Sequence, residues 1–491
     1  MKPLYFLLFF AVILVLGGVD RGFDISDEGL YALLAHPLQD NFAGIFNYDL
    51  FFKACYKLFN LHFGLIELRI IRLLSYFLGA FALAVFLRNV TKANKIQNLD
   101  FGISLLGLLA AYAFLPQTLS YNHLSVVLTC FWLALISGNI QKPAVLTLLG
   151  LVLALLAYVK IPTAVLLFLG TFIFVILQKA PRGYLVLLLI PFVLLELIFF
   201  YFLQSSAIQR LWSGLGLMIG RPDYALITLV KHTLVGVFWI GLSVGGSWMI
   251  HRLLSHKSFK FICLFLWLSG LIWLTHITEE WNHVALLFTA QLFGILGLRL
   301  DMDFWKNPAR NWILLLAIMP FLLHFGSNVY WLRIGIHYWV FWILALFIWT
   351  RNTPGFQAKT LELGLGILTC ILIFTGVWWR PFEQKSLWNY QVNWEYLPGK
   401  SIKLMPEQVQ KLKDLQSRED IQSQQQLLAV YRISGIPFLL GKTMPKSPGF
   451  WDENQLKGFF LKNLPDLPLI YNPISDLPYR PVQDPILLTE F

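Results

Sequence analysis

Long apolar segments alternate with short polar loops along most of the chain, from residue 3 to residue 379. Apolar runs of this kind can cross a hydrocarbon core of about 30 Å as helices. We predict thirteen membrane-spanning helices, at residues 4–19, 68–87, 101–115, 123–136, 144–158, 161–177, 184–203, 232–250, 261–276, 284–298, 312–325, 337–349 and 361–379. The pattern therefore predicts an all-α polytopic membrane protein.

The composition agrees with this interpretation. Of the 491 residues, 57% are hydrophobic and only 13% are charged, whereas about a quarter of the residues in soluble domains are charged. The net charge of +11 is spread over the loops rather than grouped on one module, which favours a lipid bilayer over nucleic acid as the partner. The four cysteines lie in apolar surroundings, so no disulfide framework is indicated.

The distribution of lysine and arginine predicts the orientation. A cytoplasmic N-terminus places most of these residues in cytoplasmic loops, as the positive-inside rule requires. The first apolar segment lacks an A-x-A-like cleavage site and is predicted to be retained as a helix. The only Asn-x-Thr triplet, at 89–91, then lies on the cytoplasmic side, so we expect a bacterial inner membrane rather than an endoplasmic reticulum.

Residues 380–491 differ in kind from the predicted membrane domain at 1–379, because they are polar and nearly balanced in charge. An odd number of spans places them on the periplasmic side. Pro406 is typical of a helix start, and the run at 426–433 is typical of a strand. The segment 465–485 is punctuated by proline and predicts an extended strap. We expect a small α/β periplasmic domain.

The longest predicted loop before that domain, at 20–67, is acidic and aromatic. Ser26 is a good N-cap for a short helix that Pro37 would end, and acids in its first turn suit the helix dipole. A second helix at 49–59 is amphipathic and should lie in the membrane interface. The loop is thus predicted to form two amphipathic helices on the periplasmic face.

Charged side chains concentrate in and just after this loop. Its cations are Lys53, Lys57, Arg69 and Arg72. Cations on the periplasmic side oppose the positive-inside bias and favour an anionic partner such as a lipid-linked phosphate; headgroup anchoring and pairing with Asp49 and Glu67 is the alternative. For the acids Asp24, Asp27 and Glu28, the alternative to a functional role is capping and solvation of the helix start.

The sequence at 27–32 reads Asp-Glu-Gly-Leu-Tyr-Ala, and it resembles the D-E-x-x-Y-A motif of the GT-C glycosyltransferases. The likeness is to the group that contains protein O-mannosyltransferases and lipid A aminoarabinose transferases. Residues 63–75, 120–125 and 158–163 also resemble segments of this group. A departure lies at 47–53, where Asn-Tyr-Asp-Leu-Phe-Phe-Lys replaces the frequent Pro-Pro-Leu segment, which bears on donor and acceptor identity.

The resemblance implies transfer of a sugar, usually with inversion, from a polyprenyl-phosphate donor to a hydroxyl of a lipid, glycan or protein acceptor at the periplasmic face. It makes Asp27 the general base, with Glu28 orienting Asp27 or the acceptor. The candidates for binding the donor phosphate are Lys53, Arg69, Arg72, Lys160, His283 and Arg333. The candidates for the acceptor or sugar pocket are Asp24, Tyr31, Asp49, Tyr121, Asn122, His123 and Glu280. No cofactor is expected.

Other interpretations stay open. His276 and Glu280 have the i, i+4 spacing of metal ligands, although contact with a lipid phosphate or a sugar is favoured over a metal site. Glu196 and His324 fall within predicted spans, where ionisable groups serve either function or helix-to-helix hydrogen bonds. A transporter or flippase of a lipid-linked or anionic substrate is the main alternative function, but it should carry polar groups at the membrane midplane and an internal repeat. A non-catalytic assembly subunit is a third possibility.

Overall fold

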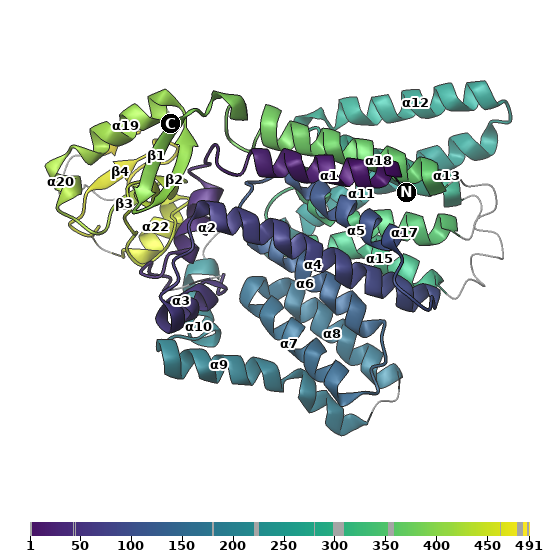
Figure 1. The fold of residues 1–491 in the computed structure, drawn as a ribbon, viewed down its shortest axis with the longest axis horizontal. Helices are drawn as coiled ribbons and strands as arrows, with labels where there is room; N and C mark the ends of the chain where they lie inside the picture. The colour runs from purple at the N-terminus through teal and green to yellow at the C-terminus, as the bar shows by residue number, and fades with distance from the viewer. Residues whose placement is uncertain are drawn as a thin grey trace.

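A computed structural model describes residues 2–42, 44, 46–178, 181–219, 225–278, 280–297, 309–351, 358–461, 463–478, 485–488 and 491. The described chain is mostly helical, and many of its long helices run roughly along the long axis of the molecule (Figure 1). The C-terminal strands gather at one end of this axis (Figure 1). The N-terminus lies away from that end, among the helices.

The helices before residue 380 vary widely in length. They are α1 (Lys2–Gly17), α2 (Asp27–Ala35), α3 (Asp49–Phe59), α4 (Leu65–Thr91), α5 (Asn98–Leu109), α6 (Tyr121–Ile136), α7 (Pro143–Val159), α8 (Ile161–Leu177), α9 (Ile190–Leu203), α10 (Ala207–Ile219), α11 (Leu226–Leu253), α12 (Lys257–Leu274), α13 (Asn282–Gly297), α15 (Arg310–His324), α16 (Trp331–Ile334), α17 (Trp339–Arg351) and α18 (Ala358–Ile373). The two helices predicted for the first long loop are present as α2 and α3.

Each of the thirteen predicted spans coincides with an apolar helix. Within the described residues, six helices are long and apolar enough to cross a membrane: Leu65–Thr91, Gly183–Leu203, Leu226–Leu253, Lys257–Leu274, Trp331–Arg351 and Glu362–Trp379. The other predicted spans coincide with shorter apolar helices of 10–17 residues. The six long helices indicate a membrane protein, and the further seven crossings stay a prediction.

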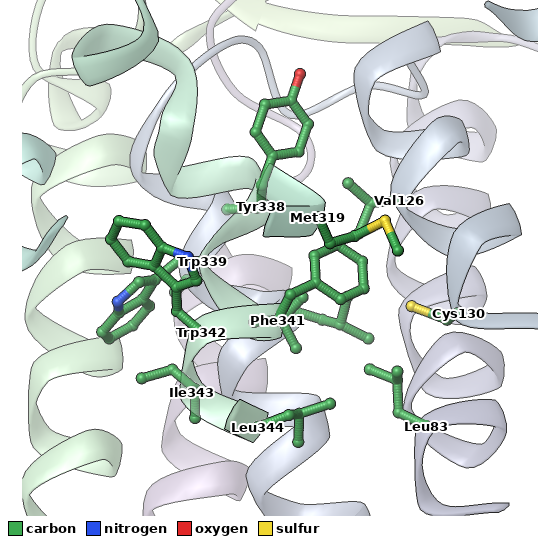
Figure 2. Packing of buried hydrophobic residues seen from close by; sticks show 14 of the residues in the cluster. Leu83, Val126, Cys130, Met319, Tyr338, Trp339, Phe341, Trp342, Ile343 and Leu344 are labelled. Atoms are coloured by element: carbon green, nitrogen blue, oxygen red, sulfur yellow. The ribbon is translucent and has the colours of Figure 1, made fainter. Parts of the chain in front are cut away.

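The centre of the helical part is α17, whose side chains are nearly all buried. Two of its tryptophans satisfy their polar atoms inside this core. Trp339 donates its indole N–H to Thr289 Oγ1 at 2.9 Å, and Trp342 donates to the Ala317 carbonyl at 2.9 Å. Because a buried N–H without a partner costs free energy, these bonds allow bulky aromatic side chains to fill the core. Figure 2 shows them beside Phe341 and the other packed side chains of this cluster.

Residues 380–491 contain the described strands, in two small sheets. Strands β1 (Val392–Leu397) and β2 (Lys400–Leu404) are antiparallel, whereas β3 (Leu428–Val430), β4 (Leu469–Tyr471) and β5 (Ile486–Leu487) are parallel in that order. The helices are α19 (Pro406–Gln416), α20 (Glu419–Gln422), α21 (Gly435–Leu439) and α22 (Glu453–Phe459). The helix predicted at Pro406 and the strand predicted in 426–433 are confirmed. Part of the predicted strap, 479–484, lies outside the described residues.

The first long loop and residues 380–491 share one hydrophobic core. Phe23, Ala32 and Leu33 of the loop are buried in the same cluster as Ile436 and other side chains of the C-terminal part. The Gly435 N–H also donates to the Ile25 carbonyl at 2.7 Å. Helix α2 is therefore held between the apolar helices and the C-terminal part, which fixes the position of the acidic motif.

Two glycines make the contact between α2 and α21 possible. A Cβ added at Gly29 would lie 2.2 Å from the Gly435 nitrogen and 2.4 Å from its Cα. These distances are too short for any side chain unless the backbone of α21 moves. Gly29 therefore lies inside a helix because the neighbouring chain passes where a side chain would be.

Replacing Gly29 with alanine is expected to destabilise the protein. Alanine is favoured over glycine by about 1 kcal/mol inside a helix, but overpacking of this contact should cost about 1–3 kcal/mol or more. Thermal unfolding of the purified protein in detergent measures the net effect. The matched control is Gly270→Ala in α12, where an added Cβ meets nothing within 4 Å. An unfolding temperature for Gly29→Ala at or above that of the wild type would contradict the close packing.

Candidate active site

A cavity of about 480 Å³ lies where α2 meets the C-terminal part, and Asp27 is in its wall. We call it the Asp27 cavity. Its polar lining consists of the carboxyl groups of Asp27, Glu383 and Asp452, the guanidinium groups of Arg333 and Arg432, the amides of Asn122 and Asn328, and the hydroxyls of Tyr31 and Tyr121. Phe46, Phe114, Phe382 and Trp451 add further aromatic surface. The cavity thus combines acids, cations and flat apolar faces.

Asp27 is the first residue of α2, and its side chain is partly exposed. Among the described residues, its carboxyl group accepts no hydrogen bond. The pKa of Asp27 is raised to about 6, because burial and, to a smaller extent, the nearby Glu383 raise it more than Arg432 and Arg333 lower it. A carboxylate whose pKa lies near neutrality can both accept and release a proton under physiological conditions.

The side chain of Asp24 caps the start of α2. Its carboxylate accepts the backbone N–H of Ser26 at 2.9 Å and that of Glu28 at 3.0 Å. Ser26 is the N-cap residue of α2, as predicted, but its side chain makes no capping bond. Asp24 is buried and does not line the cavity, so its predicted place in the sugar pocket is replaced by a role in holding α2.

The Ser26 hydroxyl connects Asp24 with Glu383. It lies 2.8 Å from Asp24 Oδ1 and 2.6 Å from Glu383 Oε2. A hydroxyl has one proton, so both contacts are hydrogen bonds only when one of the two carboxyl groups is protonated. Burial, with Asp27 and Glu383 nearby, raises the pKa of Asp24 well above its ordinary value. This shift favours the protonated form of Asp24.

Glu28 was predicted to be catalytic and Arg69 to bind the donor phosphate. In the structure these two residues form a buried ion pair with each other. Arg69 donates from Nε to Glu28 Oε1 at 2.9 Å and from a terminal nitrogen to Oε2 at 2.8 Å. Its other N–H groups donate to the carbonyls of Val19, Arg21 and Gly22. All five guanidinium donors are in use, so none is left for a phosphate. We assign the pair to anchoring α2 on α4.

Arg72 and His123 also point into the protein interior. The Arg72 guanidinium is fully buried, donates to the carbonyls of Pro116 and Ala111, and lies 4.2 Å from the ring centre of Tyr112. His123 is equally buried, and its Nε2 lies 2.7 Å from the Ser75 hydroxyl. Neither side chain lines the Asp27 cavity. Arg72 was predicted to contact the donor phosphate and His123 to contact the sugar. In the structure both side chains instead pack between helices.

Lys160 likewise acts within the fold. Its side chain is 5% exposed and donates to the Leu323 carbonyl near the end of α15. His324 follows, and its Nε2 lies 2.7 Å from the Val329 carbonyl in the next turn. These contacts hold the turn that carries Asn328 to the cavity. Lys160 is therefore a positioning residue rather than the predicted phosphate ligand.

Arg333 is the one predicted phosphate-binding residue that the structure places in the Asp27 cavity. Its side chain is 44% exposed, and its guanidinium lies over the ring of Phe114 and 3.7 Å from Glu280. His283 lies apart from the cavity lining, with its Nδ1 3.0 Å from the Thr278 hydroxyl. Glu280 is outside the described lining of the cavity and forms an ion pair with Arg333. Arg333 thus lies in the wall of the cavity, whereas His283 does not.

The predicted sugar-pocket residues Tyr31, Tyr121 and Asn122 do line the cavity. The ring of Tyr121 stacks on Phe46 at 4.3 Å and lies edge-on to Tyr31 at 6.2 Å. Asn122 is 1% exposed, and among the described residues its Oδ1 has no hydrogen-bond partner. A buried carbonyl oxygen without a partner is unusual. Its place in this wall suits a ligand that brings a hydrogen-bond donor.

Lys53 and Asp49 lie elsewhere. Asp49 is 1% exposed and pairs with Lys53 Nζ at 2.9 Å and with Arg210 at 2.6 Å. Neither Lys53 nor Asp49 is in the wall of the Asp27 cavity. The predicted donor-phosphate and sugar contacts of these two residues are therefore not made at this cavity.

Sequence reasoning missed the C-terminal residues of the cavity. Arg432 donates to Glu383 Oε1 at 2.7 Å, and its guanidinium lies 5.6 Å from the ring centre of Trp451. Glu383 and Arg432 lie hundreds of residues from Asp27 in the chain, and no local motif marks them. The one available signal was Gly29, whose missing side chain admits the C-terminal backbone beside the acidic motif.

No group of three histidine, cysteine, aspartate or glutamate side chains that could hold a metal occurs in the described part of the chain. At the motif considered for a metal, the Nδ1 of His276 lies 2.6 Å from the Trp273 carbonyl, while Glu280 pairs with Arg333. The sequence matches no protein-family model, and no curated protein matches it. The function is therefore argued from the geometry of the Asp27 cavity.

Replacing Arg69 with methionine is expected to destabilise the protein by about 3–5 kcal/mol, because Glu28 would remain as a buried charge without its partner. Combining it with Glu28→Met should recover much of this loss, since an apolar pair of similar volume can replace a buried ion pair. SDS-driven unfolding in mixed micelles measures both effects.

The control is Arg418→Met, which removes an exposed pair with Asp420 and should change stability by less than about 1 kcal/mol. If Arg69→Met is no less stable than this control, the ion pair does not anchor α2.

Proposed function

We propose that the protein is an integral-membrane glycosyltransferase that moves a sugar from a polyprenyl-phosphate donor to an acceptor hydroxyl. In this proposal Asp27 is the general base. The observation that carries it is the composition of the Asp27 cavity, in which a carboxyl group of pKa about 6 shares a wall with two arginines and several aromatic rings. The resemblance of residues 27–32 to the GT-C motif supports the same assignment.

The proposal includes thirteen crossings of a bacterial inner membrane, with the N-terminus in the cytoplasm and residues 380–491 in the periplasm. Support comes from the thirteen apolar helices at the predicted positions and from the positive-inside distribution of charge. The first long loop, the turn that carries Arg333 and the C-terminal part all meet at one cavity. A reaction at the periplasmic face needs this convergence on one side of the bilayer.

The mechanism follows from the charges of the cavity wall. Asp27 in its ionised form accepts the proton of the acceptor hydroxyl while that oxygen attacks the anomeric carbon. The bond from this carbon to the phosphate oxygen breaks, and the polyprenyl phosphate leaves with the negative charge. Arg333 and Arg432 are the cations in the wall that can stabilise this charge.

The remaining lining suits a sugar. Aromatic faces such as those of Tyr121 and Trp451 offer flat apolar surfaces to a pyranose or furanose ring. Asn122 and Asp452 can bind its hydroxyl groups. A transporter of the same ligand would need its polar groups near the membrane midplane, whereas this cavity draws on loops and on the C-terminal part. The acceptor is a hydroxyl of a lipid, glycan or protein.

Asp27→Asn is expected to lower the rate of sugar transfer by about 10²- to 10⁴-fold, the usual contribution of a general base. The assay is loss of radiolabelled mannose or aminoarabinose from its polyprenyl phosphate, in vesicles that contain the purified protein and envelope acceptors. Asp466→Asn, at an exposed carboxylate of the C-terminal part, is the matched control. Full activity in a folded Asp27→Asn protein would refute the assignment of the base.

The rate of transfer should depend on pH through Asp27. Because the base must be ionised, the rate is expected to rise with pH through about 6 and to level off above it. Arg432→Gln removes a charge that lowers the pKa of Asp27, so the midpoint should move to higher pH. Glu383→Gln removes a charge that raises this pKa, so the midpoint should move to lower pH.

The pH–rate profile of Arg418→Gln, a distant surface change, provides the reference. Midpoints that coincide in all these variants would show that another group than Asp27 controls the rate.

A further inference from the structure

A second cavity, of about 580 Å³, lies between α3, the segment that joins α9 to α10, and the C-terminal part. We call it the basic cavity, because the cations Lys53, Lys57, Arg210 and Lys446 line it. Asp40 is the only acid among its described lining residues. The described linings of this cavity and of the Asp27 cavity have no residue in common. The basic cavity is thus a separate site.

Asp49 holds two of these cations in place without neutralising the cavity. Burial alone would raise the pKa of Asp49, but Lys53 and Arg210 outweigh it and keep the pKa below its ordinary value, so the group stays ionised. One carboxylate balances only one of its two partners. With Asp40 also counted, the four cations keep two positive charges in excess.

Among the described residues, neither of the other two cations pairs with a carboxylate; each donates to a backbone carbonyl and lies over an aromatic ring. Lys57 donates to the Phe202 carbonyl at 2.5 Å, and Lys446 donates to the Phe459 carbonyl at 2.8 Å. An ammonium group has three N–H donors, so each lysine keeps donors for a ligand. Cations from α3, α10 and the C-terminal part surround one space, which is the arrangement that binds a phosphate group with several charge-assisted hydrogen bonds.

Arg210 has a fixed position because the start of α10 is capped. The Glu196 carboxylate accepts the backbone N–H groups of Ala207 and Ile208, both at 3.1 Å, and the hydroxyl of Tyr158. This settles the open interpretation of Glu196 in favour of a hydrogen bond between helices. The cap brings α10 beside α3 (Figure 1), where Arg210 reaches Asp49.

The helices that border the basic cavity also carry exposed aromatic side chains. Tyr201 of α9 is 73% exposed and Trp212 of α10 is 80% exposed, and Phe59 at the end of α3 is 67% exposed. Exposed aromatic side chains beside cations are typical of the headgroup region of a bilayer, where aromatic rings and lysines anchor a protein.

We propose that the basic cavity binds the phosphate headgroup of an anionic membrane lipid. This site lies outside the Asp27 cavity and does not rest on the proposed glycosyltransferase function. The lipid would join α3, α10 and the C-terminal part at the membrane surface. Its phosphate oxygens accept hydrogen bonds from Lys57 and Lys446. Lys53 and Arg210, which both pair with Asp49, add positive charge to the site.

The test uses the full chain in phosphatidylcholine nanodiscs, to which a phosphatidic acid with a photoactivatable diazirine is added. Crosslinked peptides identified by mass spectrometry should map to 40–57 and 203–210.

The variant Lys57→Gln/Lys446→Gln should bind the probe roughly thirtyfold more weakly, since each lysine near an anionic lipid contributes about a fivefold factor. The variant should fold, because within the described residues neither lysine is paired with a carboxylate that the change would leave without its partner. Lys411→Gln/Arg418→Gln removes two charges elsewhere and should bind as the wild type does.

Three outcomes would overturn the proposal. The first is equal crosslinking of these segments by a diazirine phosphatidylcholine, and the second is unchanged binding by Lys57→Gln/Lys446→Gln. The third is displacement of the probe by inorganic phosphate at equal concentration, which would assign the cavity to a soluble phosphate. Asp27→Asn should bind the probe normally, so failure of the glycosyltransferase proposal and failure of this one are distinguishable.

Discussion

The buried ion pair between Glu28 and Arg69 is the interaction on which the arrangement of the site depends. It ties the first turn of α2 to α4, and Asp27 is the residue directly before Glu28. A buried pair of this kind contributes little net stability compared with an apolar pair, but a break in it is costly. The role of this pair is to orient α2, because it fixes which side of the helix faces the cavity and which side faces the protein interior.

The Asp27 cavity is a composite of distant parts of the chain. The first loop supplies the proposed base, the turn before α17 supplies Arg333, and the C-terminal part supplies Arg432 and Glu383. The pKa of Asp27 depends on all three contributions, since Glu383 raises it and the two arginines lower it. Burial is the largest cause of the raised pKa, and the charged groups that adjust it lie outside the motif of Asp27.

Local sequence patterns predicted the helices well but predicted only part of the site. Apolar runs and the amphipathic pattern at 49–59 encode helices through neighbouring residues, and α3 has those bounds. The motif also led to Asp27, which does face a cavity. The sequence does not reveal the partners of Arg69, Arg72 and Lys160. These partners are backbone carbonyls and one carboxylate, which come close to the three cations only in the tertiary fold. Arg432 and Glu383 come from the far end of the chain, so no local pattern could place them beside Asp27.

The shared core of the first loop and the C-terminal part has a consequence for biosynthesis. Asp27 leaves the ribosome more than 400 residues before Trp451 and Asp452, which complete the cavity wall. A nascent chain that has already inserted its first helices therefore carries the acidic motif without a binding site around it. The order of translation delays assembly of the site until residues 451 and 452 have been made, so products truncated before them would lack it.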